Sequence, residues 1–107
     1  MQLNITGHHV EITPPLRAYV TEKMQRLSRH FDNVISINVI MKVEKLQQLA
    51  EARVNAGGRT LFATETSSDM YAAIDGLSDK LDKQVRRLKS RLRDHHHVKP
   101  DQQASGV

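Results

Sequence analysis

Apolar residues recur along this chain with two different periods, and these periods predict its secondary structure. Residues 2–7 alternate between polar and apolar side chains, which predicts a short strand. Thr13 then stands before a proline as a candidate helix N-cap, since proline fits the first helical turn. The apolar positions that follow are spaced by three and four, which predicts a helix, and they are Leu16, Val20, Met24, Leu27 and Phe31.

Strict alternation over residues 34–44 predicts the clearest strand of the chain. The positions expected on its apolar face are Ile35, Ile37, Val39, Met41 and Val43. A second strand should follow, in which Ala50, Ala52, Val54 and Ala56 share one face, and the small side chains there favour a close helix crossing. The pair Gly57-Gly58 predicts a hairpin turn into a third strand over residues 59–66. Within that strand the pattern leaves open whether Leu61 or Phe62 points inward.

A long helix is predicted from a cap among Ser67, Ser68 and Asp69 to about Arg93. Its apolar stripe is continuous and comprises Met70, Ile74, Leu77, Leu81, Val85, Leu88 and Leu92. Such a helix is longer than a small sheet needs, so we expect its C-terminal end to extend beyond the sheet. Residues 95–107 show no periodicity and are predicted to form a disordered tail.

The predicted order is therefore β-α-β-β-β-α. Three consecutive antiparallel strands flanked by helices indicate an α+β two-layer sandwich, with two helices packed on one face of a four-stranded sheet. The first strand should pair parallel to a neighbour after a crossover through the first helix. We expect one domain over residues 1–94, followed by the tail.

Length and composition narrow the class of protein further. With 107 residues the chain has room for about one domain, and it contains no cysteine, so disulfides and thiolate chemistry are excluded. The N-terminus lacks the features of a signal peptide, and no apolar run approaches the roughly 20 residues that cross a bilayer. We therefore expect a cytoplasmic protein that does not act on membranes.

Basic residues are concentrated at the end of the long predicted helix. The formal net charge is only +4, yet seven of the sixteen Lys and Arg residues lie there: Lys80, Lys83, Arg86, Arg87, Lys89, Arg91 and Arg93. Asp79 and Asp82 stand four residues before Lys83 and Arg86, and among the other cations Arg87, Lys89, Arg91 and Arg93 have no expected acidic partner in the helix. A solvated face that complements the helix dipole is one interpretation. We favour an anion-binding surface, because the dipole acts only on the last turn.

The first predicted helix adds cations to this surface. Lys23, Arg26 and His30 lie along one edge of its apolar stripe, beside Tyr19, with Arg29 a little further round. If the two helices lie side by side, their basic flanks would border a common groove, and Lys42, Lys45, Arg53 and Arg59 would extend the surface toward the sheet. Such a surface suits a phosphate backbone. The low aromatic content of 4% disfavours base stacking, so folded RNA fits best.

Motifs for catalysis or metal binding are weak. The adjacent His8 and His9 would point to opposite faces of a strand, and the run His95-His96-His97 has no carboxylate at helical spacing. Gly57-Gly58 is too short to cradle phosphates. Ser67 and Ser68 are interpreted as helix N-caps, and Asp69 and Asp75 project in different directions, so neither pair indicates a catalytic site. We expect no enzyme, no resident cofactor and no functional metal site.

Several segments together resemble a known family, the short-form ribosome hibernation promoting factors of bacteria, which are relatives of the ribosome-associated inhibitor. The resemblance covers residues 1 to about 93. It is carried by Met1-Gln-Leu-Asn-Ile-Thr-Gly7, by Val10-Glu-Ile-Thr13, by Lys42-Val-Glu-Lys45 and most specifically by Asp69-Met-Tyr-Ala-Ala-Ile-Asp-Gly-Leu77 with Asp79-Lys-Leu81. No part of the chain corresponds to the C-terminal dimerisation domain of the long form, so the short form is expected.

The resemblance implies a fold similar to a double-stranded-RNA-binding domain with an added N-terminal strand. It implies binding to the small ribosomal subunit in the channel that messenger and transfer RNA occupy, which blocks translation by exclusion. It also implies promotion of inactive ribosome dimers together with ribosome modulation factor. The residues expected to face ribosomal RNA are Lys23, Arg26, Arg29, Lys42, Lys45, Lys80, Lys83, Arg86, Arg87, Lys89, Arg91 and Arg93.

Other functions stay open from the sequence. The related inhibitor stabilises single inactive ribosomes and differs mainly in its C-terminal tail, and residues 95–107 match neither tail clearly. A general binder of structured RNA, or an adaptor whose long helix docks on an acidic protein, would carry the same charge pattern. Off the ribosome we expect a monomer.

Overall fold

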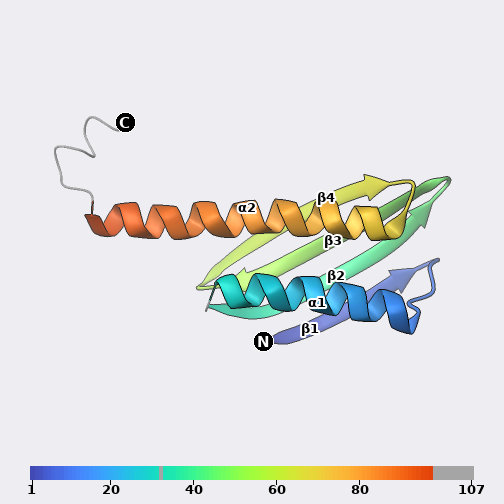
Figure 1. Ribbon diagram of the computed structural model, residues 1–107, viewed down its shortest axis with the longest axis horizontal. Coiled ribbons are helices and arrows are strands. Elements are labelled where there is room, and N and C mark those ends of the chain that lie inside the picture. Colours follow the sequence, from blue (N-terminus) through green and yellow to red (C-terminus); the bar gives the residue numbers. More distant parts are fainter. Residues whose placement is uncertain (32, 98–107) are drawn as a thin grey trace.

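A computed structural model of the chain shows a four-stranded sheet with both helices on one of its faces (Figure 1). It describes residues 1–31 and 33–97, with side chains described up to Arg91. The elements in chain order are β1 (Gln2–His8), α1 (Pro14–His30), β2 (Val34–Glu44), β3 (Gln47–Ala56), β4 (Arg59–Ser67) and α2 (Met70–His97). The predicted β-α-β-β-β-α order and the two-layer sandwich are confirmed.

The strands lie in their sequence order, β1-β2-β3-β4. β1 pairs parallel to β2, with Ile5 opposite Val39, while the two following pairs are antiparallel. The parallel pair requires a crossover, and α1 supplies it. Gly57 and Gly58 both adopt positive φ in the tight turn between β3 and β4, which brings Arg59 directly back beside β3.

The core lies between the sheet and the two helices and is almost wholly aliphatic. The stripe of α1 and that of α2 as far as Leu88 are buried as predicted, with Val20, Met24, Leu77 and Leu81 at 0% exposure. Opposite them, β3 contributes alanines at positions 50, 52 and 56, whose small side chains let the helices approach the sheet. No polar or charged side chain is buried in the described residues, so the stability of the domain rests on apolar packing.

One predicted inward position is wrong. Ile35 was expected on the apolar face of β2, but it is 65% exposed, while its neighbour Val34 is buried at 8%. The register of β2 against β3 shifts between Val34 and Ser36, which is a β-bulge. The extra residue moves Val34 into the core, and from Ile37 onward the alternation follows the prediction.

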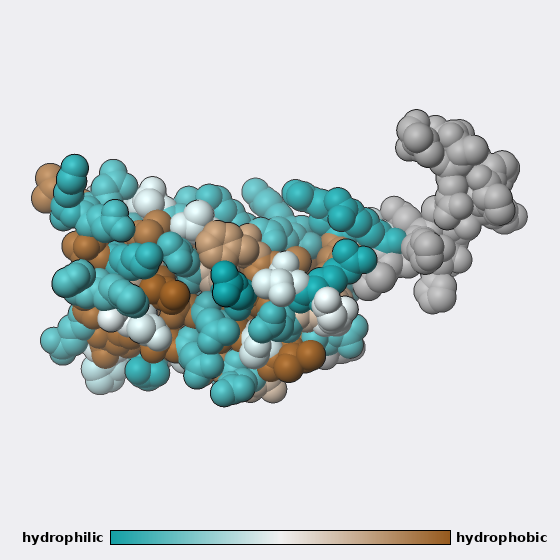
Figure 2. All heavy atoms as spheres, turned by 180° about the vertical axis from the view of Figure 1, so that it is seen from behind, coloured by the Kyte–Doolittle hydropathy of each residue, from teal (hydrophilic) through white to brown (hydrophobic). Residues whose placement is uncertain are grey.

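The open question about β4 is settled in favour of Leu61, which packs against the core, whereas Phe62 lies on the other sheet face and is 49% exposed. Figure 2 shows that other face, where hydrophilic side chains predominate and apolar patches lie between them. No helix in the described part of the chain is long and apolar enough to cross a membrane.

Both helices begin at predicted caps. The Thr13 hydroxyl accepts a hydrogen bond from the amide of Leu16 at 3.4 Å, and the Asp69 carboxylate accepts one from the amide of Ala72 at 3.2 Å. The end of α2 differs from the prediction, because its backbone stays helical to His97 rather than ending near Arg93. The apolar stripe stops at Leu92, but no glycine or proline occurs before Pro100, so nothing local ends the helix earlier. The rest of the predicted tail, residues 98–107, lies outside the described residues.

Candidate nucleic-acid interface

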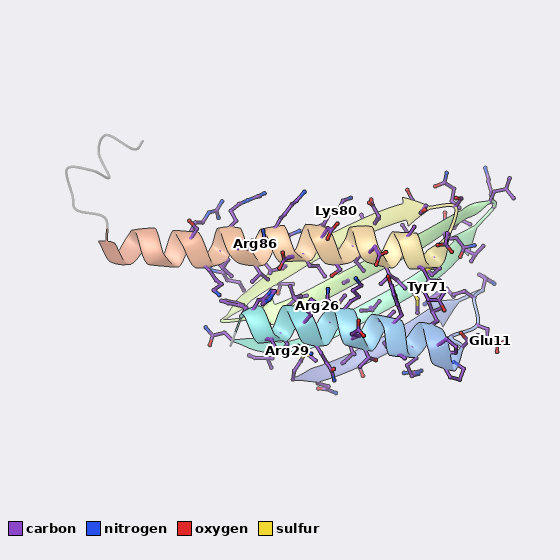
Figure 3. All side chains as sticks on the ribbon, viewed as in Figure 1. Glu11, Arg26, Arg29, Tyr71, Lys80 and Arg86 are labelled. Atoms are coloured by element: carbon purple, nitrogen blue, oxygen red, sulfur yellow. The ribbon has the colours of Figure 1, made fainter. Side chains whose placement is uncertain are left out.

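The basic half of α2 presents two flanks, one toward α1 and one toward β4, and it extends past the end of the sheet (Figure 1). Side chains from both flanks are labelled in Figure 3, with Lys80 on the β4 side and Arg86 nearer α1. The apolar stripe of α2 lies against the sheet, so the cations on either side of it are directed outward or along the two grooves. The two grooves differ in how their cations are paired.

The groove between α1 and α2 contains acids as well as bases. It is lined by Lys23, Arg26, Leu27, His30, Ser78, Asp79, Asp82 and Arg86. Asp82 lies 2.7 Å from the Arg86 guanidinium and 3.3 Å from the His30 ring. The predicted common groove therefore exists, but much of its positive charge is neutralised from within.

The cations of α1 are themselves engaged. Lys23 lies 3.3 Å from the carboxylate of Asp75 on α2, and Arg26 lies 3.6 Å from Glu22 one turn earlier. Arg29 is exposed and does not line the groove between the helices. Of the three predicted RNA-facing residues of α1, Arg29 alone has no ion pair in the described part of the chain.

Lys89 has a structural contact that the sequence did not indicate. Its ammonium donates a hydrogen bond of 2.6 Å to the backbone carbonyl of His30 at the end of α1. A lysine in this position satisfies one of the carbonyls left unpaired at a helix C-terminus. Lys89 therefore joins the two helices, in addition to any contact with an external anion.

The groove between α2 and β4 has a different charge balance. At its inner end Lys80 pairs with Glu65 at 2.9 Å and donates to the carbonyl of Thr64, and Gln84 donates to the carbonyl of Phe62. These side chains cover carbonyls along the edge strand β4. Further along, the cations Lys83, Arg87, Arg91 and Arg59 have no acidic partner within the described residues.

Two predicted residues lie apart from this surface. Lys42 lies on the sheet face opposite the helices and approaches Glu51 of β3 at 3.5 Å. Lys45 is in the turn between β2 and β3, with φ of 55°, at the end of the sheet where α2 begins. The structure thus does not bring Lys42 and Lys45 together with the basic half of α2. The side chain of Arg93 lies outside the described residues.

A polar cluster at the other end of the groove fixes the two helices to each other. Tyr19 of α1 donates a hydrogen bond to Asp75 of α2, and its ring packs edge-on against Tyr71 with centroids 5.0 Å apart. The Lys23 ammonium lies 5.3 Å from the centre of the Tyr19 ring. The hydrogen bond to Asp75, together with burial, raises the pKa of the Tyr19 phenol above its usual 10.0.

The sequence signals captured the cations but missed most of their partners. Asp75 pairs with Lys23 on the other helix, and Glu65 on β4 pairs with Lys80 on α2, so spacing within one element did not reveal either pair. In the part of the chain that the structure describes, no three His, Cys, Asp or Glu side chains are placed to hold a metal ion. Chemically, the candidate site is a set of positively charged Lys and Arg side chains carried by α2.

Fold and surface together define a small α+β domain whose cation-rich face suits a polyanion such as RNA. The sequence profile of the family described as Sigma 54 modulation protein / S30EA ribosomal protein matches residues 3–93. The chain belongs to this family. Its curated relatives include the ribosome hibernation promoting factor of Pseudomonas putida, which is 53% identical over 91 residues, or 85% of this chain and 89% of that protein.

Other relatives give the same result. The ribosome hibernation promoting factor of Escherichia coli K12 is 45% identical over 95 residues, which cover 89% of this chain and all of that protein. Among solved structures, a ribosomal subunit interface protein from Coxiella burnetii superimposes with a TM-score of 0.77 at 32% identity, covering 84% of this chain and 99% of that one. The N-terminal domain of Thermus thermophilus Protein Y also gives 0.77, at 34% identity, covering 82% and 99%. The expected resemblance to the short hibernation factors is confirmed.

Proposed function

We propose that this protein is a ribosome hibernation factor that binds the small ribosomal subunit in the channel for messenger and transfer RNA. Occupying that channel blocks translation by exclusion, so the protein needs no reaction chemistry. Acting with ribosome modulation factor on the same ribosome, it promotes inactive ribosome dimers. Its place of action is then the bacterial cytoplasm, and off the ribosome it is a monomer.

The observation that carries this proposal is the match to hibernation factors along nearly the whole described domain, on a chain whose α2 presents unpaired cations. The curated relatives are ribosome hibernation promoting factors, and at 45–53% identity a shared partner is the simplest inference. A ribosomal RNA surface supplies phosphates at high density, and fixed Lys and Arg side chains bind phosphates without reading sequence.

The site residues differ, under this proposal, in whether another group of the protein already engages their charge. Lys83, Arg87 and Arg91 on α2 and Arg29 on α1 carry charge that no described acid compensates, so they are the strongest candidates for RNA contacts. Lys23, Arg26, Lys80, Arg86 and Lys42 already pair with acids and would contribute less, because an RNA phosphate must compete with those partners. Lys89 is held by the carbonyl of His30.

Sucrose-gradient sedimentation of ribosomes, with the protein and ribosome modulation factor each present or absent, tests the proposal. We expect the protein to cosediment with small subunits, to inhibit translation in vitro, and to produce dimers only when both factors are present. Protection of single ribosomes without dimers would instead assign it to the inhibitor type. Failure to cosediment at low salt would contradict the proposal as a whole.

The salt dependence of binding adds a quantitative check. About six phosphate contacts predict a slope of order −4 to −5 in a plot of log affinity against log salt. A salt-insensitive interaction would point to docking on a protein instead. Binding of an unrelated RNA duplex as tightly as ribosomes, at the same salt, would favour a general binder of structured RNA.

A further inference from the structure

We infer that the hollow between the basic half of α2 and the start of β4 is a discrete phosphate-binding site, with Arg59 as an essential member. The hollow has a volume of about 290 Å³ and is lined by Arg59, Thr60, Leu61, Gln84, Arg87, Leu88 and Arg91. The assignment deepens the proposed function, on which it rests for the source of the phosphate. In the ribosome complex the hollow holds a phosphate group of the RNA backbone.

Among the described side chains, none compensates the charge around the hollow. Three guanidinium groups border it, no described acidic side chain does, and none of the three forms an ion pair in the described part of the chain. By contrast, the groove between α1 and α2 contains Asp79 and Asp82. An anion that approaches this end of the molecule therefore meets net positive charge on the β4 side and a mixed surface on the α1 side.

Local structure brings the three arginines together. Arg87 and Arg91 are separated by one helical turn on the same flank of α2, an arrangement of like charges that slightly destabilises a helix on its own. Arg59 is the first residue of β4, and the Gly57-Gly58 turn places it at the strand end nearest that flank. A bound anion would relieve the repulsion among all three, which couples the site to its ligand.

The chemistry of the lining favours phosphate over a nucleobase or a carboxylate-bearing peptide. Guanidinium groups present a rigid fork of donors that matches phosphate oxygens bidentately. No aromatic side chain lines the hollow, so it offers no platform on which a base could stack. Leu61 and Leu88 form an apolar floor, and the lower local dielectric strengthens charge-assisted hydrogen bonds at the rim.

Gln84 helps to preorganise the hollow. Its side-chain amide donates a 2.9 Å hydrogen bond to the carbonyl of Phe62, which ties this flank of α2 to β4. Because the helix and the strand are fixed to each other here, the backbone positions that carry Arg59 and Arg87 keep a defined separation before any ligand binds. Preorganisation of this kind reduces the entropy that binding must spend.

The test compares variants that each lose one positive charge. In the hollow set, Arg59, Arg87 and Arg91 are replaced by glutamine one at a time. The matched control is Arg17→Gln, an exposed arginine of α1 that lines neither the hollow nor the groove between the helices. Affinity for small subunits is measured over a range of salt, and circular dichroism verifies that every variant is folded.

Each hollow variant should bind small subunits about tenfold more weakly than the original protein, as expected when one charge-assisted hydrogen-bonding group is lost. The salt slope should fall by about one per arginine. The control should change affinity less than threefold, a margin on the order of a weak screened charge. Arg59→Lys should restore only part of the loss, since it keeps the charge but not the fork.

Equal losses in the hollow and control sets would overturn the site and leave the ribosomal function intact, because general charge would then explain binding. If the original protein itself fails to bind ribosomes, the proposed function is wrong. A titration of the free protein with phosphate ligands then tests separately whether the hollow binds phosphate. In that titration, the side-chain NMR signals of the three arginines are followed with inorganic phosphate, a nucleoside triphosphate and a short RNA duplex. Shifts with the duplex support an RNA backbone ligand, shifts only with the small phosphates overturn that source, and no shift overturns the site.

Discussion

Replacing Gly76 of α2 with alanine should reveal how closely this helix approaches β4. A Cβ atom at position 76 would lie 2.7 Å from Cγ and 2.9 Å from Cδ of Glu65, and nearer still to one carboxylate oxygen. All of these atoms belong to a flexible side chain rather than to the backbone. The Glu65 side chain must therefore rotate away, which breaks its 2.9 Å pair with Lys80.

The expected free-energy change is a balance of opposing terms. Alanine stabilises a helix interior by about 1 kcal/mol relative to glycine. Loss of the Lys80–Glu65 pair costs roughly 0.5 kcal/mol, since both side chains are partly exposed at 49% and 33%. Moving Glu65 into a less favourable rotamer costs about another 0.5–1 kcal/mol. Gly76→Ala alone should thus leave the free energy of unfolding nearly unchanged.

The contact becomes visible in a double-mutant cycle. With Glu65→Ala already present, the same Gly76→Ala change meets no carboxylate and should stabilise the protein by about 1 kcal/mol. The coupling free energy between the two positions is then about 1 kcal/mol, as is usual for residues in direct contact. Urea unfolding of the original protein, both single variants and the double variant, at one pH and salt concentration, measures it.

Two results would refute this reasoning. Equal stabilisation by Gly76→Ala in both backgrounds would mean that the Glu65 side chain does not lie against the helix. Strong destabilisation in both backgrounds would mean that the backbones of α2 and β4 themselves are too close for a Cβ atom. Unchanged m values across the cycle are the control that the unfolded state is the same in all four proteins.

The fold could be predicted from the sequence wherever apolar residues recur with a single period over a long segment. The stripe from Met70 to Leu88 and the alternation from Ile37 to Met41 both match buried positions. Ile35 was placed wrongly, because strict alternation with Ile37 and Val39 assigns it to the apolar face, although the neighbouring Val34 is equally apolar. The pairing register with β3 determines that Val34 rather than Ile35 faces the core. A single-residue bulge of this kind cannot be recognised in a hydropathy pattern.

The charges of the candidate site were predictable, and so was the pairing of Asp82 with Arg86 within α2, but the pairings between different elements were not. Clustering of cations in the last part of α2 is a property of adjacent sequence, and so it was visible directly. The ion pair of Lys23 with Asp75 joins two helices, and it depends on how they pack. The same holds for Arg59, which borders the same hollow as Arg87 only because the β3–β4 turn folds β4 back along α2. As a result, the groove between α1 and α2 is less positive than the groove between α2 and β4.

Three further predictions concern stability. Ile37→Ala should lower the free energy of unfolding by about 2–5 kcal/mol, because Ile37 is fully buried. Ile35→Ala should change it by less than about 0.5 kcal/mol, because Ile35 is exposed, and urea unfolding compares the two variants. Asp69→Ala removes the N-cap of α2 and should cost about 1 kcal/mol in the same assay, and no loss would show that another residue caps the helix. Tyr19 should make stability depend on pH, because its hydrogen bond to Asp75 raises its pKa and so favours the neutral phenol in the folded state. The stability from this group is complete below the ordinary pKa of 10.0 and falls as pH rises through the raised value, since ionising the phenol breaks its donation to Asp75. Urea unfolding between pH 8 and pH 11, on the order of one unit beyond that pKa, should therefore show a steeper loss for the original protein than for Tyr19→Phe, and parallel curves would contradict the role of this hydrogen bond.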